Sequence, residues 1–128
     1  MTPNWEWPLI SRLTLRNYYE GLLLGARYML YVDGAKFYID VAREFMKRGS
    51  AENARLNAEE AARNINHAIE VLRKMTEKGL PSGISAELLV DLDLAKNRIK
   101  EGNYEGALVW IDSARRKFVW LMMDLLSK

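Results

Sequence analysis

Few residues of this 128-residue chain have the types and spacing that chemistry requires. The single histidine, His67, follows Arg63 by one helical turn and is the chain's only imidazole acid–base group. Asp91-Leu92-Asp93 begins like a calcium loop, but Ala95 stands at the fifth position and the glycine needed at the sixth is missing. We therefore interpret this run as the charged edge of a helix. The absence of cysteine excludes disulfides, thiolate catalysis and zinc–thiolate sites.

The carboxylates form no recognisable catalytic motif. A di-iron bundle needs a Glu-x-x-His motif on each of two helices, and this chain has none. Asp33 and Asp40 are near Tyr28, Tyr31 and Tyr38 in sequence, but a solvated helix face explains them better than a buried general acid does. Glycine-rich phosphate loops, Ser-His-Asp sets and dinucleotide fingerprints are missing too. We expect no catalytic residue, no metal and no cofactor.

The last predicted helix, residues 104–127, is more apolar than one buried face requires. A stripe from Tyr104 to Leu125 is wide enough for the core, yet other apolar side chains fall outside it. Either the other helices surround this one, or its outer side meets another chain. In the second case the partner-binding residues are Trp110, Trp120, Val109, Met123 and Leu126.

The rest of the chain also predicts helices, in a single domain over residues 1–128. Nearly half of the residues are Ala, Leu, Glu, Lys or Arg, and no segment alternates like a strand. We expect an all-α bundle of four or five helices over about 14–48, 51–78, 86–101 and 104–127, with Thr14, Ser50, Ser85 and Asn103 as caps. Trp5 and Trp7 between two prolines predict an extended aromatic arm over residues 1–12, docked on the bundle or anchoring a partner.

The first long helix shows an apolar face that changes sides near Asp33-Gly34. One straight helix cannot bury opposite faces in a two-layer core, and Asp-Gly is a helix-breaking dipeptide. We favour a kink or short turn there, with a continuous helix as the alternative. Gly21 and Gly25, four residues apart, predict a notch where a neighbouring helix or the aromatic arm packs closely.

Charge and hydropathy narrow the class of partner. The 19 basic and 17 acidic residues are interleaved, so nucleic-acid binding is disfavoured. Apolar runs are far shorter than the roughly 20 residues of a membrane span, and the N-terminus has no signal-peptide pattern. We expect a cytoplasmic protein that does not bind membranes.

Two short stretches resemble parts of known families. The run E-G-N-Y-E-G-A-L, with Ile111 and Ala114 after it, resembles the turn and second helix of a tetratricopeptide repeat over Leu88 to Phe118, without a second copy 34 residues away. The same hairpin is similar to those of small HEPN-type bundles. Arg63 and His67 resemble the arginine–histidine pair of HEPN ribonucleases at a shorter spacing, and this likeness implies nucleic-acid binding or cleavage.

The sequence leaves three hypotheses for function. The first is a non-catalytic bundle that binds a protein partner or forms a homo-oligomer through the last helix. The second is a HEPN-like protein that acts on nucleic acid with Arg63 and His67. The third is a designed bundle or binder, because cysteine and glutamine are absent, as in thermophilic or engineered chains, and the capping of residues 50–79 is regular.

Overall fold

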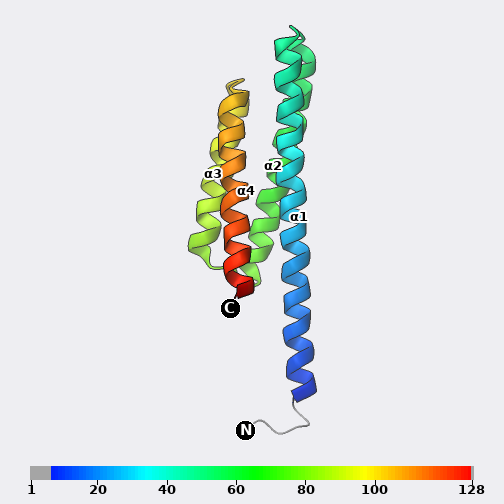
Figure 1. Cartoon of the computed structure of the whole chain (residues 1–128), viewed down its shortest axis with the longest axis vertical. Coiled ribbons are helices and arrows are strands. Elements are labelled where there is room, and N and C mark those ends of the chain that lie inside the picture. Colours follow the sequence, from blue (N-terminus) through cyan, green and yellow to red (C-terminus); the bar gives the residue numbers. More distant parts are fainter. Residues whose placement is uncertain (1–6, 128) are drawn as a thin grey trace.

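The chain folds into four α-helices, and its described part contains no strand (Figure 1). The structure is a computed structural model that describes the backbone of residues 7–127 and the side chains of residues 20–124. The helices are α1 (Trp7–Lys47), α2 (Ala51–Glu77), α3 (Ser82–Lys100) and α4 (Tyr104–Ser127). The predicted all-α bundle is therefore confirmed, with four helices.

Each of the three turns between helices is built around a glycine in the left-handed region. The glycines are Gly49, Gly79 and Gly102, with φ of 79°, 111° and 74°. A residue with a Cβ would adopt this backbone at a cost of about 1–2 kcal/mol. The N–H of Asn103, after the last glycine, donates to the Arg98 carbonyl oxygen at 2.9 Å, and the other two turns repeat this bond. The predicted helix ends at these glycines are confirmed.

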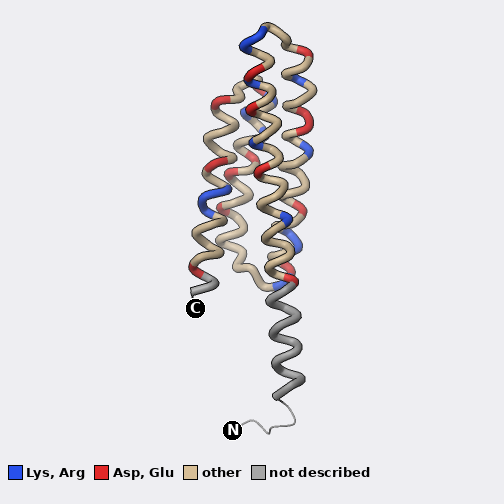
Figure 2. The backbone as a smooth tube through the Cα atoms, turned by 45° about the vertical axis from the view of Figure 1, so that its right-hand side comes forward, with Lys and Arg blue, Asp and Glu red and all other residues tan. Residues whose placement is uncertain are grey.

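The four helices form an up-and-down bundle. In sequence order, each helix contacts the next, and α1 also contacts α4 to close the ring (Figures 1 and 2). The diagonal pairs, α1 with α3 and α2 with α4, make no contact through the described residues. Short turns between consecutive helices enforce this antiparallel order. Each helix therefore has two neighbours and one outward side.

The core follows three- and four-residue steps on every helix; the steps alternate on α2, α3 and α4, and the α1 seam begins with two four-residue steps. This spacing keeps one seam facing inward along antiparallel helices, as in coiled coils. The buried seam residues are Leu24, Tyr28, Val32, Ala35, Ile39 and Ala42 on α1, Ala54, Ala58, Ala61, Ile65, Ala68, Leu72 and Met75 on α2, Leu88, Leu92, Ala95 and Ile99 on α3, and Ala107, Ile111, Ala114, Phe118 and Leu121 on α4.

Helix α1 runs without a break through Asp33 and Gly34, so the continuous alternative describes it and the predicted kink is not confirmed. Each residue of this dipeptide has a packing role instead. A Cβ at position 34 would be 2.6 Å from Asn64 Oδ1 of α2, so glycine lets the two helices approach closely. Asp33 accepts a 2.9 Å hydrogen bond from Arg115 of α4.

The predicted change of buried face along α1 is wrong. The core seam stays on one side of the helix from Leu24 to Ala42, while Leu30 and Phe37 are exposed. The helix therefore has two apolar faces over the same length. A periodicity search cannot say which of two apolar faces is the buried one, and this ambiguity produced the error.

Two other helix starts differ from the prediction. Helix α1 begins at Trp7, so residues 7–12 are helical rather than part of an extended arm, and Thr14 is not its cap; residues 1–6 lie outside the described part. Pro8 fits there because a helix tolerates proline in its first turn.

Helix α3 begins at Ser82 and not at Ser85. Ser85 is instead a buried residue, and its Oγ accepts a 2.9 Å hydrogen bond from Thr76 Oγ1. Ser50, the other serine predicted as a cap, is the N-cap residue of α2, but its side chain makes no capping hydrogen bond. Asn103 is a cap as predicted, since its Oδ1 accepts from the Gly106 N–H at 2.9 Å.

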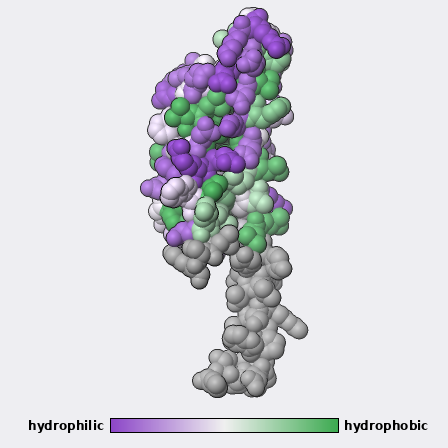
Figure 3. Space-filling view, in the orientation of Figure 1, coloured by the Kyte–Doolittle hydropathy of each residue, from purple (hydrophilic) through white to green (hydrophobic). Residues whose placement is uncertain are grey.

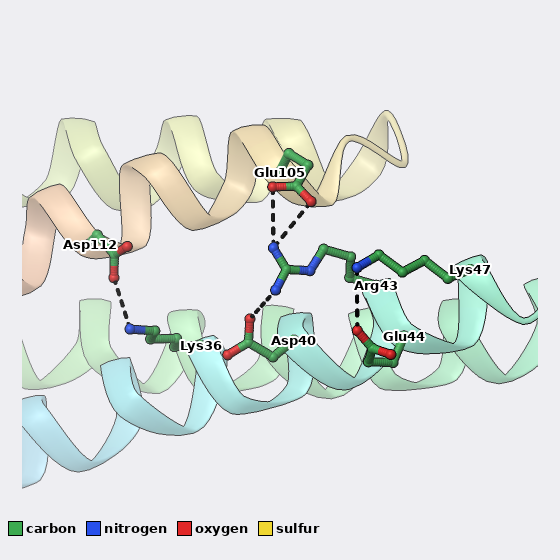
Figure 4. A network of polar contacts seen from close by, with 7 residues as sticks. All are labelled: Lys36, Asp40, Arg43, Glu44, Lys47, Glu105 and Asp112. Carbon is green, nitrogen blue, oxygen red and sulfur yellow. Dashed lines mark hydrogen bonds and ion pairs between the residues drawn. The ribbon is translucent and has the colours of Figure 1, made fainter.

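Ion pairs along the α1–α4 seam fix how these two helices align (Figure 4). Arg43 of α1 contacts Glu105 of α4 at 3.1 Å, and Lys36 contacts Asp112 at 3.5 Å. One step of seven residues separates the pairs on each helix, in opposite directions, as antiparallel seams require. Arg43 also contacts Asp40 of its own helix at 3.4 Å. In this alignment charges of opposite sign therefore meet along the seam.

Candidate functional site

The candidate site is the outer side of α4. Ala107, Ile111, Ala114 and the rest of the inward seam hold this helix against α1 and α3, which leaves the opposite side toward solvent. The alternative that the other helices surround α4 is wrong, because α4 occupies a corner of the bundle. Three predicted partner-binding residues are exposed on this side: Val109 at 62%, Trp120 at 72% and Met123 at 66%.

A groove between α3 and α4 lies beside Trp120. Its volume is about 590 Å³. Lining it are Ile84, Glu87, Leu88, Arg116, Lys117, Trp120, Leu121 and Asp124. Apolar side chains are combined with charges of both signs, as in surfaces that receive an amphipathic segment of another chain.

The four predicted residues whose side chains are described do not form one patch. Trp120 and Met123 are three residues apart on the outer side, whereas Val109 is eleven residues, about 16 Å of helix, from Trp120. Trp110 is half-buried and packs against the core. The side chain of Leu126 lies outside the described residues. Trp120, Met123 and the groove therefore form the candidate partner-binding surface.

A buried carboxylate, which the sequence interpretation missed, lies beneath this surface. Asp91 is 1% exposed, so the interpretation of residues 91–93 as the charged edge of a helix is wrong for this residue. Its Oδ2 accepts a 2.7 Å hydrogen bond from Ser113 Oγ and is 3.2 Å from Lys117 Nζ. Ser113 and Lys117 are one turn apart on α4, so both can reach one carboxylate on a neighbouring helix. This spacing was the feature of the sequence that could have indicated the cluster. The cluster ties α3 to α4.

Tyr28 of α1 lies in the same region of the core. Its ring packs on Phe118 with centroids 4.3 Å apart, and its hydroxyl donates to the Ala114 carbonyl oxygen at 3.4 Å. Burial, with a smaller contribution from the negative charge of Asp91, raises the pKa of Tyr28 far above its ordinary value. The phenol therefore stays neutral and serves packing, since the carboxylate and phenol are closed off from solvent.

Arg63 and His67 lie one turn apart on α2 but engage different neighbours. Arg63 is exposed and paired with Glu60 of its own helix. The imidazole of His67 stacks on Tyr31 of α1, with ring centroids 5.0 Å apart. His67 also lines a polar groove of about 430 Å³ together with Arg73, Asp93 and Lys96. No test of the ribonuclease hypothesis follows from these contacts, and it stays a prediction.

Within the described residues, no group of three or more histidine, aspartate or glutamate side chains is placed to hold a metal ion. None of the helices, over the residues described, has an apolar stretch long enough to cross a membrane. Comparison with protein-family models gives no match, and comparisons with curated proteins and with solved structures give none either.

Proposed function

We propose that the protein is a non-catalytic interaction module that binds another protein chain, either a different protein or a second copy, through the outer side of α4. The observation that carries the proposal is Trp120, a tryptophan that is 72% exposed at the edge of the groove between α3 and α4. Exposed tryptophan next to a groove is typical of the residues that dominate protein interfaces.

The groove chemistry supports a helical or extended segment as the bound element. Ile84, Leu88 and Leu121 offer apolar contacts along its length. Arg116 and Lys117 on α4 and Glu87 on α3 supply charges at its rim. A segment with one apolar side and mixed charges would contact all of these groups at once. Met123 extends the apolar area beside Trp120.

A two-step experiment tests this proposal. A photo-crosslinking residue replaces Trp120 in one variant and, as a matched control, Val90 in another, because Val90 is 55% exposed on the outer side of α3. We expect a specific chain to be captured from position 120 and not from position 90. Binding of that purified chain should then weaken roughly 30-fold with Trp120→Ala, equivalent to about 2 kcal/mol.

Solution mass covers the case in which the partner is a second copy. If the α4 surface joins two copies, Trp120→Glu gives a monomer while Val90→Glu keeps the assembled mass. Equal capture from both positions, together with a mass that neither substitution changes, would refute binding through α4. Circular dichroism of each variant shows whether the bundle has remained folded.

A further inference from the structure

Helix α1 presents a second apolar surface on the side opposite its core seam. Leu23, Leu30 and Phe37 are 55%, 69% and 60% exposed, and each is seven residues from the next. Seven residues are almost two helical turns, so these side chains form one row along the helix. Figure 3 shows apolar side chains along the edge of the molecule that α1 occupies. The same spacing extends the row to Glu44.

A second row runs beside the first, on the flank nearer α2. Gly34 belongs to it, four residues after Leu30 and next to Asn64 of α2. Its other members, Arg27, Val41 and Arg48, follow at the same seven-residue spacing and are exposed or half-exposed. Together the two rows alternate steps of four and three residues, the spacing by which one helix packs along another. We call these eight residues the α1 face: Leu23, Arg27, Leu30, Gly34, Phe37, Val41, Glu44 and Arg48.

Part of the α1 face is hollowed into a groove. The groove has a volume of about 250 Å³, and every residue that lines it belongs to α1 or directly follows it. Its lining residues are Phe37, Asp40, Val41, Glu44, Phe45 and Arg48. A continuous apolar area with a polar rim is typical of surfaces that bind another protein.

We propose that the α1 face of one copy packs antiparallel against the α1 face of a second copy, in a two-fold symmetric dimer. The symmetry axis passes between residues 35 and 36. Every position of the face then lies opposite another position of the face. Going outward from the axis, the opposed pairs are Gly34 with Phe37, Leu30 with Val41, Arg27 with Glu44 and Leu23 with Arg48. Such an interface is isologous, so each pair occurs twice in one closed assembly.

Charge complementarity favours this alignment. Arg27 is exposed and has no ion-pair partner among the residues that the structure describes. Glu44 is half exposed and contacts Lys47 of its own helix at 3.4 Å. The proposed dimer places Arg27 opposite Glu44 of the second copy at two symmetric positions. Charged residues within a helix–helix seam fix its register and orientation in this way.

Other alignments of two α1 helices lose this complementarity. Parallel helices would place Arg27 opposite Arg27 and Glu44 opposite Glu44. An antiparallel shift of seven residues would place Arg27 opposite Phe37 or beyond the end of α1. The arrangement with its axis between residues 35 and 36 is therefore the one that pairs opposite charges while keeping the apolar positions together.

Side-chain size is complementary as well. Phe37, the largest side chain of the face, lies opposite Gly34, which has no side chain. Leu30 enters the groove at Val41 of the second copy. At each end of the interface, Leu23 meets the methylene chain of Arg48, whose charged group stays in water.

The acidic side chains beside the face are neutralised within each chain. Asp33 and Asp40 lie on the flank nearer α4, and the antiparallel order brings Asp33 of one copy near Asp40 of the other. Asp33 is 2.9 Å from Arg115, and Asp40 is 3.4 Å from Arg43. The dimer therefore brings no unpaired carboxylate of this flank against another. Its interface lies on a different helix from the surface proposed for α4.

Solution mass tests the dimer directly. Light scattering from micromolar to millimolar concentration should approach twice the 14.8 kDa chain mass for the parent protein. Leu30→Glu places a charge in the apolar part of the face without touching the core, so its mass should be halved while its helical signal is unchanged. Val90→Glu, a similarly exposed change on α3, should keep the dimer mass.

Mixing two charge variants tests the register. Arg27→Glu and Glu44→Arg each make both charged pairs repulsive, so each variant alone should dimerise roughly tenfold more weakly than the parent. An equimolar mixture should recover the parent affinity, because both pairs of a mixed dimer again join opposite charges. Positions 27 and 44 are about 26 Å apart within one chain, so this recovery arises only between chains. In a parallel dimer neither variant alone would be weaker than the parent.

Cross-linking tests the antiparallel geometry independently. Because the chain has no cysteine, single cysteines can be placed at will. The two copies of position 37 are about 5 Å apart along the paired helices, so Phe37→Cys should cross-link to itself with a short bis-maleimide. The two copies of position 48 are about 38 Å apart, so Arg48→Cys should not.

Any of three results would overturn the proposal. The first is a parent protein that is monomeric at every concentration, including one whose α1 face binds a different protein. The second is a Leu30→Glu variant that keeps the dimer mass; if Trp120→Glu then gives a monomer, the copies meet through α4. The third is a mixture of the two charge variants that dimerises no better than either alone, or cross-linking at position 48 equal to that at position 37.

Discussion

Tyr28 shows how a buried polar side chain makes stability depend on pH. Its pKa is raised by burial and by Asp91, so the folded protein keeps the phenolic proton at a pH where the unfolded chain loses it, near the ordinary value of about 10. The unfolded state then binds fewer protons, and stability is present below this pH and falls above it.

We therefore expect the free energy of unfolding to fall more steeply above about pH 10 in the parent protein than in Tyr28→Phe, by up to about 1.4 kcal/mol per pH unit. At neutral pH the two proteins should differ by no more than about 1 kcal/mol, since the bond lost to Ala114 is long. Urea unfolding across the alkaline range measures the difference. Parallel pH profiles would show that Tyr28 is not the group responsible.

Gly21 and Gly25 show how two identical residues on one helix differ in role. A Cβ at position 25 would be 3.3 Å from Phe118 Cζ and 3.5 Å from Met122 Cε, whereas a Cβ at position 21 meets no described atom within 4 Å. The predicted notch is therefore confirmed at Gly25, where it receives α4, whereas no described side chain approaches position 21.

The two glycines form a matched pair for mutagenesis. Gly25→Leu should lower the free energy of unfolding by about 1–3 kcal/mol, because the new side chain has to displace Phe118 and Met122. Gly21→Leu should raise it by up to about 1 kcal/mol through better helix propensity. Thermal unfolding of both variants measures these two changes in stability. Equal destabilisation would mean that position 21 is also packed.

At the scale of elements, the sequence predicted the features that depend on residues close together in the chain, namely the helices and their ends. Glycines in the three turns and apolar periodicity gave the four helices and most of their ends. The exposure of Trp120 and Met123 followed from an apolar excess that one face of α4 could not accommodate. The burial of Asp91 could not be predicted in this way, because it depends on Ser113 and Lys117 reaching it from the next helix.

The α1–α4 seam supplies an element-scale prediction. Arg43→Glu brings a third carboxylate next to Asp40 and Glu105, and we expect a loss of about 1 kcal/mol. The double variant Arg43→Glu, Glu105→Arg should recover at least half of that loss, because an opposite pair is restored across the seam. Unfolding free energies for the two singles and the double give the coupling energy.

Salt dependence provides the control for this cycle. The pair is partly exposed, so the measured coupling should shrink as ionic strength rises. A double variant that is no more stable than the sum of its singles would show that these charges do not align α1 with α4.

At the scale of the whole molecule, residues 7–19 of α1 continue beyond the end of α2. The described core seam of α1 starts at Leu24, and the ion pair of Glu20 with Lys78 closes the end of the bundle. Residues N-terminal to Glu20 lie beyond the last turn that α2 shares with α1. The four-helix core should therefore not depend on them.

Deletion of residues 1–19 tests this separation in one chain. We expect the shortened protein to unfold cooperatively, with a free energy of unfolding within about 1 kcal/mol of the full-length chain, because no described core residue is removed. Loss of cooperative unfolding would instead show that residues 1–19 complete the core of the chain.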